Sequence, residues 1–259
     1  MKAIGIIPGR MASSRFPGKP LAKILGIPMI GHVYLRSKMS GVLDGVYVAT
    51  CDEEIKQYVE SIGGKAVMTS DKHERASDRA EEALLKIEQA TGQRADIVVM
   101  IQGDEPMLVP EMIETAVKPM LEQEDILVVN LMAPIRTIKE HEDPNEVKVV
   151  VDKNNYALYF SREPIPSRKK GATEVTMLKQ VCIIPFRRDF LIEFSRLEPT
   201  PLEKVESVDM LRVLEHGYKV KMVFSDFATY SVDTPDDLRS VEEHMKKDTL
   251  LARYSGVAR

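Results

Sequence analysis

The first 121 residues alternate short apolar runs, rich in valine and isoleucine, with segments of helical length. The apolar runs lie at residues 3–7, 46–50, 65–69 and 96–101. The expected helices span residues 29–40, 52–62, 77–90 and 111–121. This alternation is typical of parallel βαβ units. The nearly unbroken apolar run before Gln102 predicts a strand buried on both faces, and Pro110 marks the entry to the following helix.

The pattern changes in the middle of the chain, where strand-like runs follow one another without full helices between them. These runs lie at residues 126–135, 146–152, 156–162 and 179–186. We interpret them as a mixed or antiparallel extension of the sheet. Residues 161–174, rich in proline, glycine and basic side chains, predict an exposed loop. The remaining elements expected are helices near 187–195 and 208–216, a strand at 219–224 and a last helix at 235–245.

Composition narrows the class of protein. With 259 residues, 44% of them apolar, the chain can bury the core of one large α/β domain or of a domain with a substantial appendage. Cys51 and Cys182 are the only cysteines, which excludes a disulfide framework and favours a reducing, cytoplasmic location. Charges of both signs are well mixed, with a net charge of -4, so we expect no nucleic-acid partner. No run approaches the roughly 20 apolar residues of a membrane span, so we expect a soluble protein with no membrane partner.

The strongest local signal is the loop from Pro8 to Leu21, which follows a buried strand. It carries three cations, Arg10, Arg15 and Lys19, together with two serines and two glycines. Backbone amides and fixed cations are what a triphosphate requires, and the carboxyl end of a strand is where open α/β sheets bind ligands. The loop lacks GxxxxGK[ST] and GxGxxG, which disfavours a P-loop kinase and a Rossmann dehydrogenase. Its position favours binding over the alternative of a basic surface turn.

Two acidic residues are candidate ligands for Mg²⁺. Asp104, in Gln-Gly-Asp-Glu-Pro after the most apolar strand, should emerge beside the first loop, and a helix-entry turn would not explain that whole motif. Asp233 lies in SVDTPDDL, where Asp233 or Thr234 could instead cap the helix that Pro235 opens. Capping and metal binding therefore both stay open for Asp233. Two converging carboxylates would hold a metal that offsets charge on the α-phosphate and the leaving pyrophosphate.

Residues 73–82 place several polar side chains at a strand-to-helix junction. Ser77 or Asp78 is expected to cap the helix, while His73 and Arg79 could help to shape a base pocket. The basic run 168–170 is interpreted as a solvated loop, with acceptor contact as the lesser alternative. The other histidines are expected to be structural or solvated: His32, His141, His216 and His244.

Several motifs together resemble one known family. The segments that carry the resemblance are, in this order, IIPGRMASSRFPGKPL, HERASDR, QGDEP, PNEVKVVVD, YALYFSREPIP, TPLEKVESVDMLRVLEHG and VDTPDDL. In these segments the chain resembles the CMP-Kdo synthetases, the cytidylyltransferases of 3-deoxy-D-manno-octulosonate. The resemblance covers nearly the whole chain. It implies an α/β fold of the Rossmann-like nucleotidyltransferase type, with three α/β/α layers, a mixed central sheet and a smaller β-rich dimerisation extension. Residues 1–259 would form a single nucleotidyltransferase domain, with 126–186 contributing the acceptor side and the dimer contact.

The resemblance also implies the activity. A Mg²⁺-dependent enzyme, a homodimer, would transfer CMP from CTP to a Kdo-like 2-keto-3-deoxy sugar acid and release pyrophosphate. Its product would serve lipopolysaccharide or capsule biosynthesis. An acceptor oxygen would attack the α-phosphorus in line, with positioning and electrostatics supplying most of the rate. No side chain stands out as an obligatory general base, although Asp233 or the metal could assist deprotonation.

The site residues implied by the resemblance fall into three groups. The nucleotide side comprises Pro8, Arg10, Ser13, Arg15, Lys19, His73, Ser77, Arg79 and Gln102. The metal ligands are Asp104 and Asp233, which with Lys19 form the catalytic group. The acceptor side comprises Arg162, Gln180, Ile184, Glu206 and Met210.

Some positions depart from the family pattern. His73–Ser77 reads HERAS where the family usually reads HQSGT, which alters the nucleotide pocket. Gln180 and Ile184 replace a histidine and a tyrosine, and Met210 replaces a glutamine. Because sites built to hydrogen-bond a hydroxyl discriminate strongly, these changes point to a different acceptor, such as 8-amino-Kdo or another anionic small molecule. A nucleotide-sugar-dependent glycosyltransferase is less favoured, since three cations suit a triphosphate better, and a non-catalytic nucleotide sensor would not need both acids.

Overall fold

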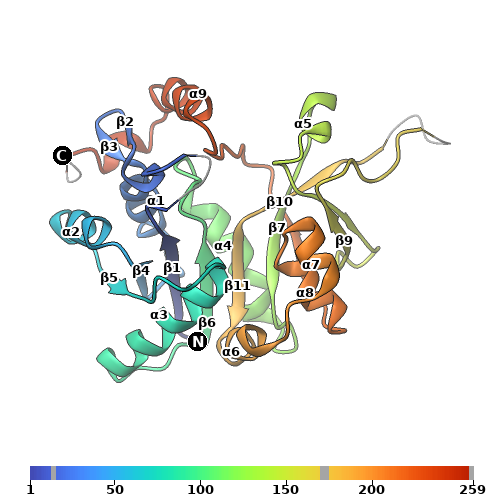
Figure 1. Cartoon of the computed structure of the whole chain (residues 1–259), viewed down its shortest axis with the longest axis horizontal. Helices are drawn as coiled ribbons and strands as arrows, with labels where there is room; N and C mark the ends of the chain where they lie inside the picture. Colours follow the sequence, from blue (N-terminus) through green and yellow to red (C-terminus); the bar gives the residue numbers. More distant parts are fainter. Residues whose placement is uncertain (13–15, 170–174, 257–259) are drawn as a thin grey trace. The chain divides into compact units, whose positions relative to one another are not determined.

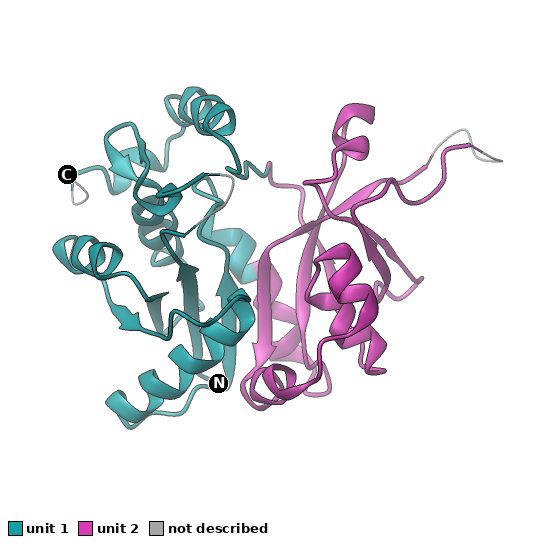
Figure 2. Ribbon diagram, viewed as in Figure 1, with its two compact units in different colours: residues 1–114, 229–259 teal, residues 115–228 magenta. Residues whose placement is uncertain are grey.

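The computed structural model describes residues 1–12, 16–169 and 175–256. The chain forms two compact units (Figure 2): unit 1 comprises residues 1–114 and 229–259, and unit 2 comprises residues 115–228. The chain passes from one unit to the other within helix α4 (Pro110–Glu122), which begins at the expected proline. The prediction of a single domain with an acceptor-side and dimerisation region at 126–186 stays a prediction.

Unit 1 is built on parallel strands. They run in the order β6-β1-β4-β5 and comprise β1 (Ala3–Gly9), β4 (Gly45–Thr50), β5 (Ala66–Met68) and β6 (Ile97–Ile101). The connecting helices are α1 (Met29–Ser37), α2 (Glu53–Ser61) and α3 (Ala76–Thr91) (Figure 1). Every side chain of β6 is at most 4% exposed, so the expected strand buried on both faces is confirmed. The βαβ units predicted from the apolar pattern are likewise confirmed.

The strand order of unit 1 reverses beside β1. The chain steps from β1 to β4 and β5 in one direction and then returns to β6 on the other side of β1. Because parallel crossovers are right-handed, α1 and α2 cover one face of the sheet and α3 covers the opposite face. The loops that follow β1 and β6 therefore emerge side by side, at the topological switch point where such sheets bind ligands.

The start of α3 differs from the sequence prediction. We expected Ser77 or Asp78 as the N-cap, whereas the helix begins at Ala76 and the extended Arg75 occupies the N-cap position. Ser77 is fully buried within the first turn. The prediction was wrong because residues of α3 hold the preceding loop, so that tertiary contacts rather than the best capping side chain fix where the helix begins. Helix α1 likewise ends at Ser37, three residues before the predicted end at Ser40.

The C-terminal part of unit 1 packs against its N-terminal part. Helix α9 (Pro235–Met245) has the predicted bounds, and its Val241 and Met245 share a buried cluster with Ile24, Met29 and Val232. A small hairpin of β2 (Lys23–Ile24) and β3 (Ile27–Pro28) supplies one side of this cluster. The segment after β1, α1 and the last helix are therefore held together by one piece of apolar core.

His32 joins the same region through buried polar groups. Its Nε2 lies 2.9 Å from the Ile24 carbonyl, which can only accept, so Nε2 carries the hydrogen and Nδ1 accepts from the Tyr254 hydroxyl at 2.7 Å. That hydroxyl accepts in turn from Arg36 Nε at 2.9 Å. Burial lowers the pKa of His32 to about 4, so the ring is neutral at physiological pH. The interpretation of His32 as structural agrees with these contacts.

Unit 2 contains a second sheet, of mixed direction. Its strand order is β12-β7-β10-β8-β9, in which β12 runs parallel to β7 and the other neighbours are antiparallel. The strands are β7 (Val129–Pro134), β8 (Lys148–Val151), β9 (Ala157–Ser161), β10 (Leu178–Val181) and β12 (Lys221–Phe224). The expected mixed strand direction is confirmed, but these strands form a second sheet instead of extending the first. Strand β12 is a member that the sequence did not assign to this group.

One predicted strand is in fact two. The apolar run 179–186 divides at Cys182 into β10 and β11 (Ile183–Arg187). The two halves pair differently, since β10 lies between β7 and β8 whereas Phe186 of β11 bridges to Val128. An unbroken apolar run does not reveal a change of pairing partner, which is why the sequence predicted a single element.

The described part of unit 2 also contains helices that follow α4. They are α5 (Ile138–Glu142), α6 (Arg188–Arg196), α7 (Pro201–Glu206) and α8 (Met210–Glu215). The sequence predicted α6 and α8 and missed α5 and α7. For α7 a signal was present, because Thr200-Pro201 followed by Glu203 is a capping-box pattern. Glu203 and Arg212 then join α7 to α8 through a buried bidentate ion pair of 2.8 and 2.6 Å. No helix among the described residues has the length and apolar character needed to cross a bilayer.

Candidate active site

A cavity of about 330 Å³ opens in unit 1 where the loops after β1 and β6 meet. Seven predicted site residues line it: Pro8, Arg10, Lys19, His73, Arg79, Gln102 and Asp104. The structure therefore brings together residues that the sequence placed in three separate motifs. Ser13 and Arg15 lie outside the described residues, and Ser77 is buried at the start of α3.

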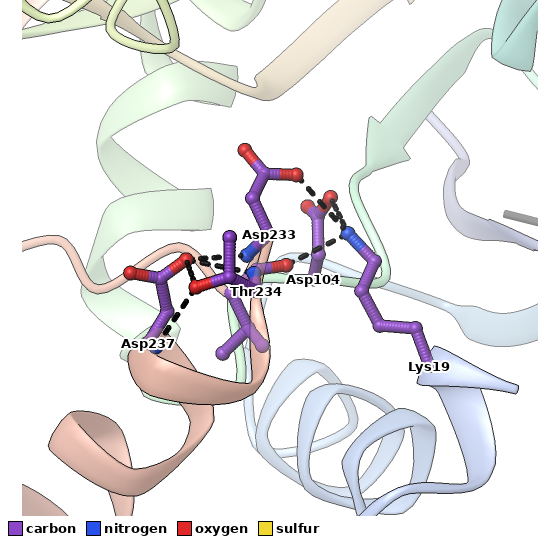
Figure 3. Close-up of polar contacts among 6 residues, drawn as sticks. Lys19, Asp104, Asp233, Thr234 and Asp237 are labelled. Atoms are coloured by element: carbon purple, nitrogen blue, oxygen red, sulfur yellow. Dashed lines mark hydrogen bonds and ion pairs between the residues drawn. The ribbon is translucent and has the colours of Figure 1, made fainter. Parts of the chain in front are cut away.

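Lys19 occupies the centre of the polar site (Figure 3). Its Nζ lies 2.9 Å from Asp104 Oδ2 and 3.4 Å from Asp233 Oδ1, and it donates to the Val232 carbonyl at 2.7 Å. The three acceptors come from the segment after β6 and from the segment that precedes α9. Because the Lys19 side chain is only 13% exposed, this ammonium group is held in a defined place between the two acids.

The capping alternative for Asp233 is resolved by its neighbour. Thr234 is the N-cap of α9, and its hydroxyl oxygen accepts from the Asp237 backbone N–H at 3.2 Å. Asp237 completes the capping box by accepting from Thr234 N at 2.8 Å (Figure 3). The helix is thus capped by Thr234, while the Asp233 carboxylate faces Lys19.

Backbone hydrogen bonds hold the two acidic segments side by side. Val232 N donates to the Asp104 carbonyl at 3.0 Å, and Tyr230 N donates to the Glu105 carboxylate at 3.2 Å. These bonds connect residues that are more than 120 positions apart in sequence. They explain how two acids from distant segments come to share one lysine.

Gly103 permits the close approach of the two loops. A Cβ atom at this position would lie 3.1 Å from the Pro8 carbonyl oxygen and 3.1 Å from Ile30 Cδ1. Both distances are shorter than ordinary van der Waals contact, and the carbonyl belongs to the backbone of β1, which cannot easily move. The Gln-Gly-Asp motif therefore needs glycine at position 103, because any larger residue would collide with the strand that precedes the first loop.

The two carboxylates fit a hard divalent cation. Asp104 Oδ1 is buried and has no hydrogen-bond partner within the described part of the chain, so it keeps an acceptor for a further ligand. Two carboxylates and one ammonium leave a formal charge of -1. Mg²⁺ binds through one or two carboxylates and completes its shell with phosphate oxygens and water. Among the described residues, no group of three or more His, Cys, Asp or Glu side chains is arranged to hold a metal ion.

His73 is held beside the cavity by α3. Glu82 accepts from His73 Nε2 and, at 2.9 Å, from the Ser70 backbone N–H. Burial raises the pKa of Glu82, but the hydrogen bonds from Lys86, Ser70 and His73 outweigh it and lower the pKa to about 2. Glu82 is therefore an ionised anchor for the loop that precedes α3, a role that the sequence did not suggest.

Arg79 reinforces the same loop. Its Nη1 donates to Thr69 Oγ1 at 2.5 Å, and its Nη2 donates to the His73 carbonyl at 3.4 Å. Arg10 also donates to that carbonyl, at 3.4 Å. The contacts of Arg79, which is 2% exposed, thus hold the wall of the cavity, and the shared carbonyl links this wall to the cationic loop.

Two predicted acceptor-side residues meet in unit 2. The Glu206 carboxylate accepts from Arg162 N at 2.7 Å and from Ser161 Oγ at 2.8 Å. The Arg162 guanidinium donates to the carbonyl oxygens of Glu206 at 2.7 Å and of Pro144 at 2.8 Å. The pair therefore fastens α7 to the end of β9.

The other three acceptor-side residues do not form a common polar group. Gln180 Nε2 donates to the Asn130 amide oxygen at 2.6 Å. Ile184 is 3% exposed and Met210 is fully buried, so both side chains pack in the interior. Their role in acceptor choice stays a prediction.

The fold and the site define a class of protein. A cationic loop and a pair of carboxylates meet at the switch point of a parallel sheet, the arrangement of a nucleotide-binding α/β transferase. A family model described as Cytidylyltransferase matches residues 4–222. The chain belongs to this family and, within it, to the 3-deoxy-manno-octulosonate cytidylyltransferases, which confirms the resemblance of the motifs and the enzyme class.

The similarity extends over nearly the whole length of the relatives. The 3-deoxy-manno-octulosonate cytidylyltransferase of Geotalea uraniireducens (strain Rf4) is 43% identical over 257 residues, covering 95% of this chain and 100% of the relative. That of Fusobacterium nucleatum subsp. nucleatum is 41% identical over 250 residues, covering 96% and 99%. A solved structure of CMP:2-keto-3-deoxy-manno-octonic acid synthetase complexed with CTP is 40% identical, with a TM-score of 0.88 and coverage of 95% and 99%. The predicted mixed α/β nucleotidyltransferase fold is thereby confirmed.

Proposed function

We propose that this protein transfers CMP from CTP to 3-deoxy-D-manno-octulosonate in a Mg²⁺-dependent reaction that releases pyrophosphate. The observation that carries the proposal is the convergence of Asp104 and Asp233 on the Lys19 ammonium, at the edge of the cavity that Lys19 and Asp104 line. The names of the relatives supply the nucleotide and the acceptor.

Arg10 and Lys19 would bind the phosphates of CTP. Both are basic side chains of the loop after β1, and both line the cavity. Phosphate oxygens would compete with the carboxylates for the Lys19 ammonium. Fixed cations aimed at the phosphates stabilise the charge that develops as pyrophosphate leaves, without further reorganisation.

Asp104 and Asp233 would hold Mg²⁺. When bound, the ion would supply charge neutralisation to the α-phosphate and the leaving group. The two carboxylates would set its place. The hydrogen bond from Val232 N to the Asp104 carbonyl would keep the carboxylate-bearing segments together. The Asp237 carboxylate, which accepts from the backbone N–H groups of Asp233 and Thr234, would hold the second segment in its conformation. In-line attack by the acceptor then depends on positioning rather than on a dedicated base.

The choice of acceptor is the part of the proposal that depends most on residues particular to this chain. Gln180, Ile184 and Met210 stand where the family pattern has polar groups, so 8-amino-Kdo and other 2-keto-3-deoxy sugar acids belong in the same assay. A homodimer formed through unit 2 is part of the proposal, since strands β9 and β12 expose Leu158 (62%) and Phe224 (49%). Because CTP is a cytoplasmic metabolite, the proposal includes a cytoplasmic location.

The decisive test measures pyrophosphate release with Mg²⁺, each of the four ribonucleoside triphosphates and the acceptor panel. We expect turnover with CTP and Kdo and no turnover in Asp104→Ala. Glu114→Ala is the control and should keep full turnover, because the Glu114 carboxylate accepts from Gly41 and does not contact Lys19. Turnover with 8-amino-Kdo but not with Kdo would change the acceptor that we assign and leave the proposed reaction class unchanged. Failure to bind CTP would overturn the proposal as a whole.

A further inference from the structure

Asp52 uses its side chain in an unusual way for its position. It is the N-cap residue of α2, where an aspartate ordinarily accepts from the first amides of its own helix, yet its side chain makes no such bond. Its Oδ2 instead accepts from the backbone N–H of Met11 at 2.8 Å. The carboxylate thus reaches across to the loop after β1, 41 positions earlier in the chain.

The surrounding contacts aim the carboxylate at this target. Strands β1 and β4 are paired so that Gly9 faces Thr50, which places the two strand ends side by side. The Asp52 backbone N–H donates to Thr50 Oγ1 at 3.1 Å, and Cys51 Sγ lies 3.5 Å from Asp52 Oδ2. Thr50 is fully buried, so this support is rigid.

Met11 is the base of the cationic loop. While its N–H is bound by Asp52, its carbonyl accepts from Gly18 N at 3.0 Å and so closes the loop. Gly18 has a φ of 74°, a left-handed conformation that glycine adopts without strain. Arg10 directly precedes Met11 and Lys19 directly follows Gly18, so the two backbone hydrogen bonds of Met11 hold the segments that carry both cations.

A carboxylate beside a loop that binds phosphates weakens the attraction for an anion. Its presence there is explained by position and not by charge. We propose that Asp52 is a positioning residue for the triphosphate loop, acting through Met11 on Arg10 and Lys19. The inference rests on the proposed function for its kinetic consequences, while its structural consequence can be measured without any nucleotide.

The kinetic test compares Asp52→Ala with Asp52→Asn. Hydrogen bonds to charged acceptors contribute enough that their loss should raise KM for CTP about tenfold. The inhibition constant for CMP should change less than about twofold, because CMP lacks the β- and γ-phosphates. Asp52→Asn keeps an acceptor oxygen for the Met11 N–H and should restore the KM. A uniform fall in kcat with unchanged KM, or an Asn variant as impaired as Ala, would overturn the inference.

Glu54→Ala is the matched control. Glu54 is an exposed acid in the first turn of α2, so this change removes the same charge at the same helix end without touching the loop. We expect its KM for CTP to equal that of the unmodified protein. A KM raised equally in both alanine variants would assign the effect to the charge of the helix terminus and overturn the positioning role.

Amide hydrogen exchange provides the readout that is independent of function. In protein without nucleotide, Asp52→Ala should increase exchange of peptides that contain Met11 and Gly18, while peptides of α2 stay as protected as before. Asp52→Asn should leave both unchanged. If exchange of the loop is identical in all variants, the inference fails even where CTP turnover is normal; if exchange changes as expected but CTP does not bind, only the proposed function fails.

Discussion

Lys19 Nζ lies 2.9 Å from Asp104 Oδ2, although 85 positions separate the two residues in sequence. The pair joins the loop after β1 to the segment after β6, which are neighbours because the strand order reverses at this point. Asp233 approaches the same ammonium from a third segment. The consequences of this arrangement can be tested one residue at a time.

Replacing Lys19 by methionine should cost activity far more than stability. The change keeps a side chain of similar length but leaves the two carboxylates without their ammonium. It also removes a cation from the proposed phosphate site. We expect kcat/KM to fall by about 10²–10³-fold, the usual cost of losing one charged group that stabilises a developing negative charge. Pyrophosphate release and a urea unfolding curve measure the two effects. Equal losses in activity and fold, with most of the protein unfolded, would contradict this prediction.

Variants of Asp233 and Thr234 should show that one residue acts in the candidate site and the other caps α9. Thr234→Ala removes the N-cap hydroxyl of α9 and should lower the free energy of unfolding by about 1 kcal/mol, with little change in kcat. Asp233→Asn should do the reverse, because it removes a carboxylate charge from the site and leaves the cap in place. Urea unfolding together with initial rates for both variants provides the comparison. Loss of activity in Thr234→Ala without loss of stability would show that the two roles are not divided in this way.

His32 should make the protein less stable in mild acid. Its pKa is lowered to about 4 in the folded protein from an ordinary value of 6.5, so the unfolded chain takes up the proton first as pH falls. The stabilisation is present above about pH 6.5 and is lost progressively down to about pH 4, by up to about 3 kcal/mol. Urea unfolding between pH 7.5 and 5 measures the slope.

The matched variant for this pH dependence is His32→Gln, which keeps a donor for the Ile24 carbonyl and does not titrate. We expect its stability to be lower at pH 7.5 but to change less between pH 6.5 and 5 than that of the unmodified protein. Identical slopes in the two proteins would mean that other groups cause the acid sensitivity.

Removing one partner of the buried ion pair Glu203–Arg212 should lower the free energy of unfolding more than replacing both partners by apolar residues. Both side chains are at most 4% exposed, so Glu203→Ala leaves an uncompensated buried guanidinium and should destabilise by about 3–5 kcal/mol. The double variant Glu203→Leu, Arg212→Met removes both charges and should be less destabilised than Glu203→Ala alone. Thermal or urea unfolding gives the order of the three proteins. A double variant that is the least stable of the three would argue that the pair is a net source of stability.

The acceptor-side residues show which features of a site can be predicted from sequence motifs and which cannot. Sequence motifs singled out Arg162 and Glu206, and the structure shows the two bound to each other. The same motifs gave no indication that Ile184 and Met210 are interior residues, since an apolar side chain in a strand or a helix fits either face. Which face is buried depends on how β11 and α8 pack.

The sequence by itself determined the elements that local forces control. Apolar periodicity fixed the parallel strands of unit 1, Pro110 and Pro235 marked helix starts, and the cationic loop and the Gln-Gly-Asp motif predicted the candidate nucleotide site. Only the tertiary structure decided which acid does what: Thr234 caps α9 and releases Asp233 toward Lys19, Asp52 binds Met11 instead of its own helix, and β12 joins the second sheet. The physical reason is that a carboxylate, a hydroxyl or a strand edge can be satisfied by many partners. The choice among them is made by contacts between segments far apart in the chain, which local pattern does not encode.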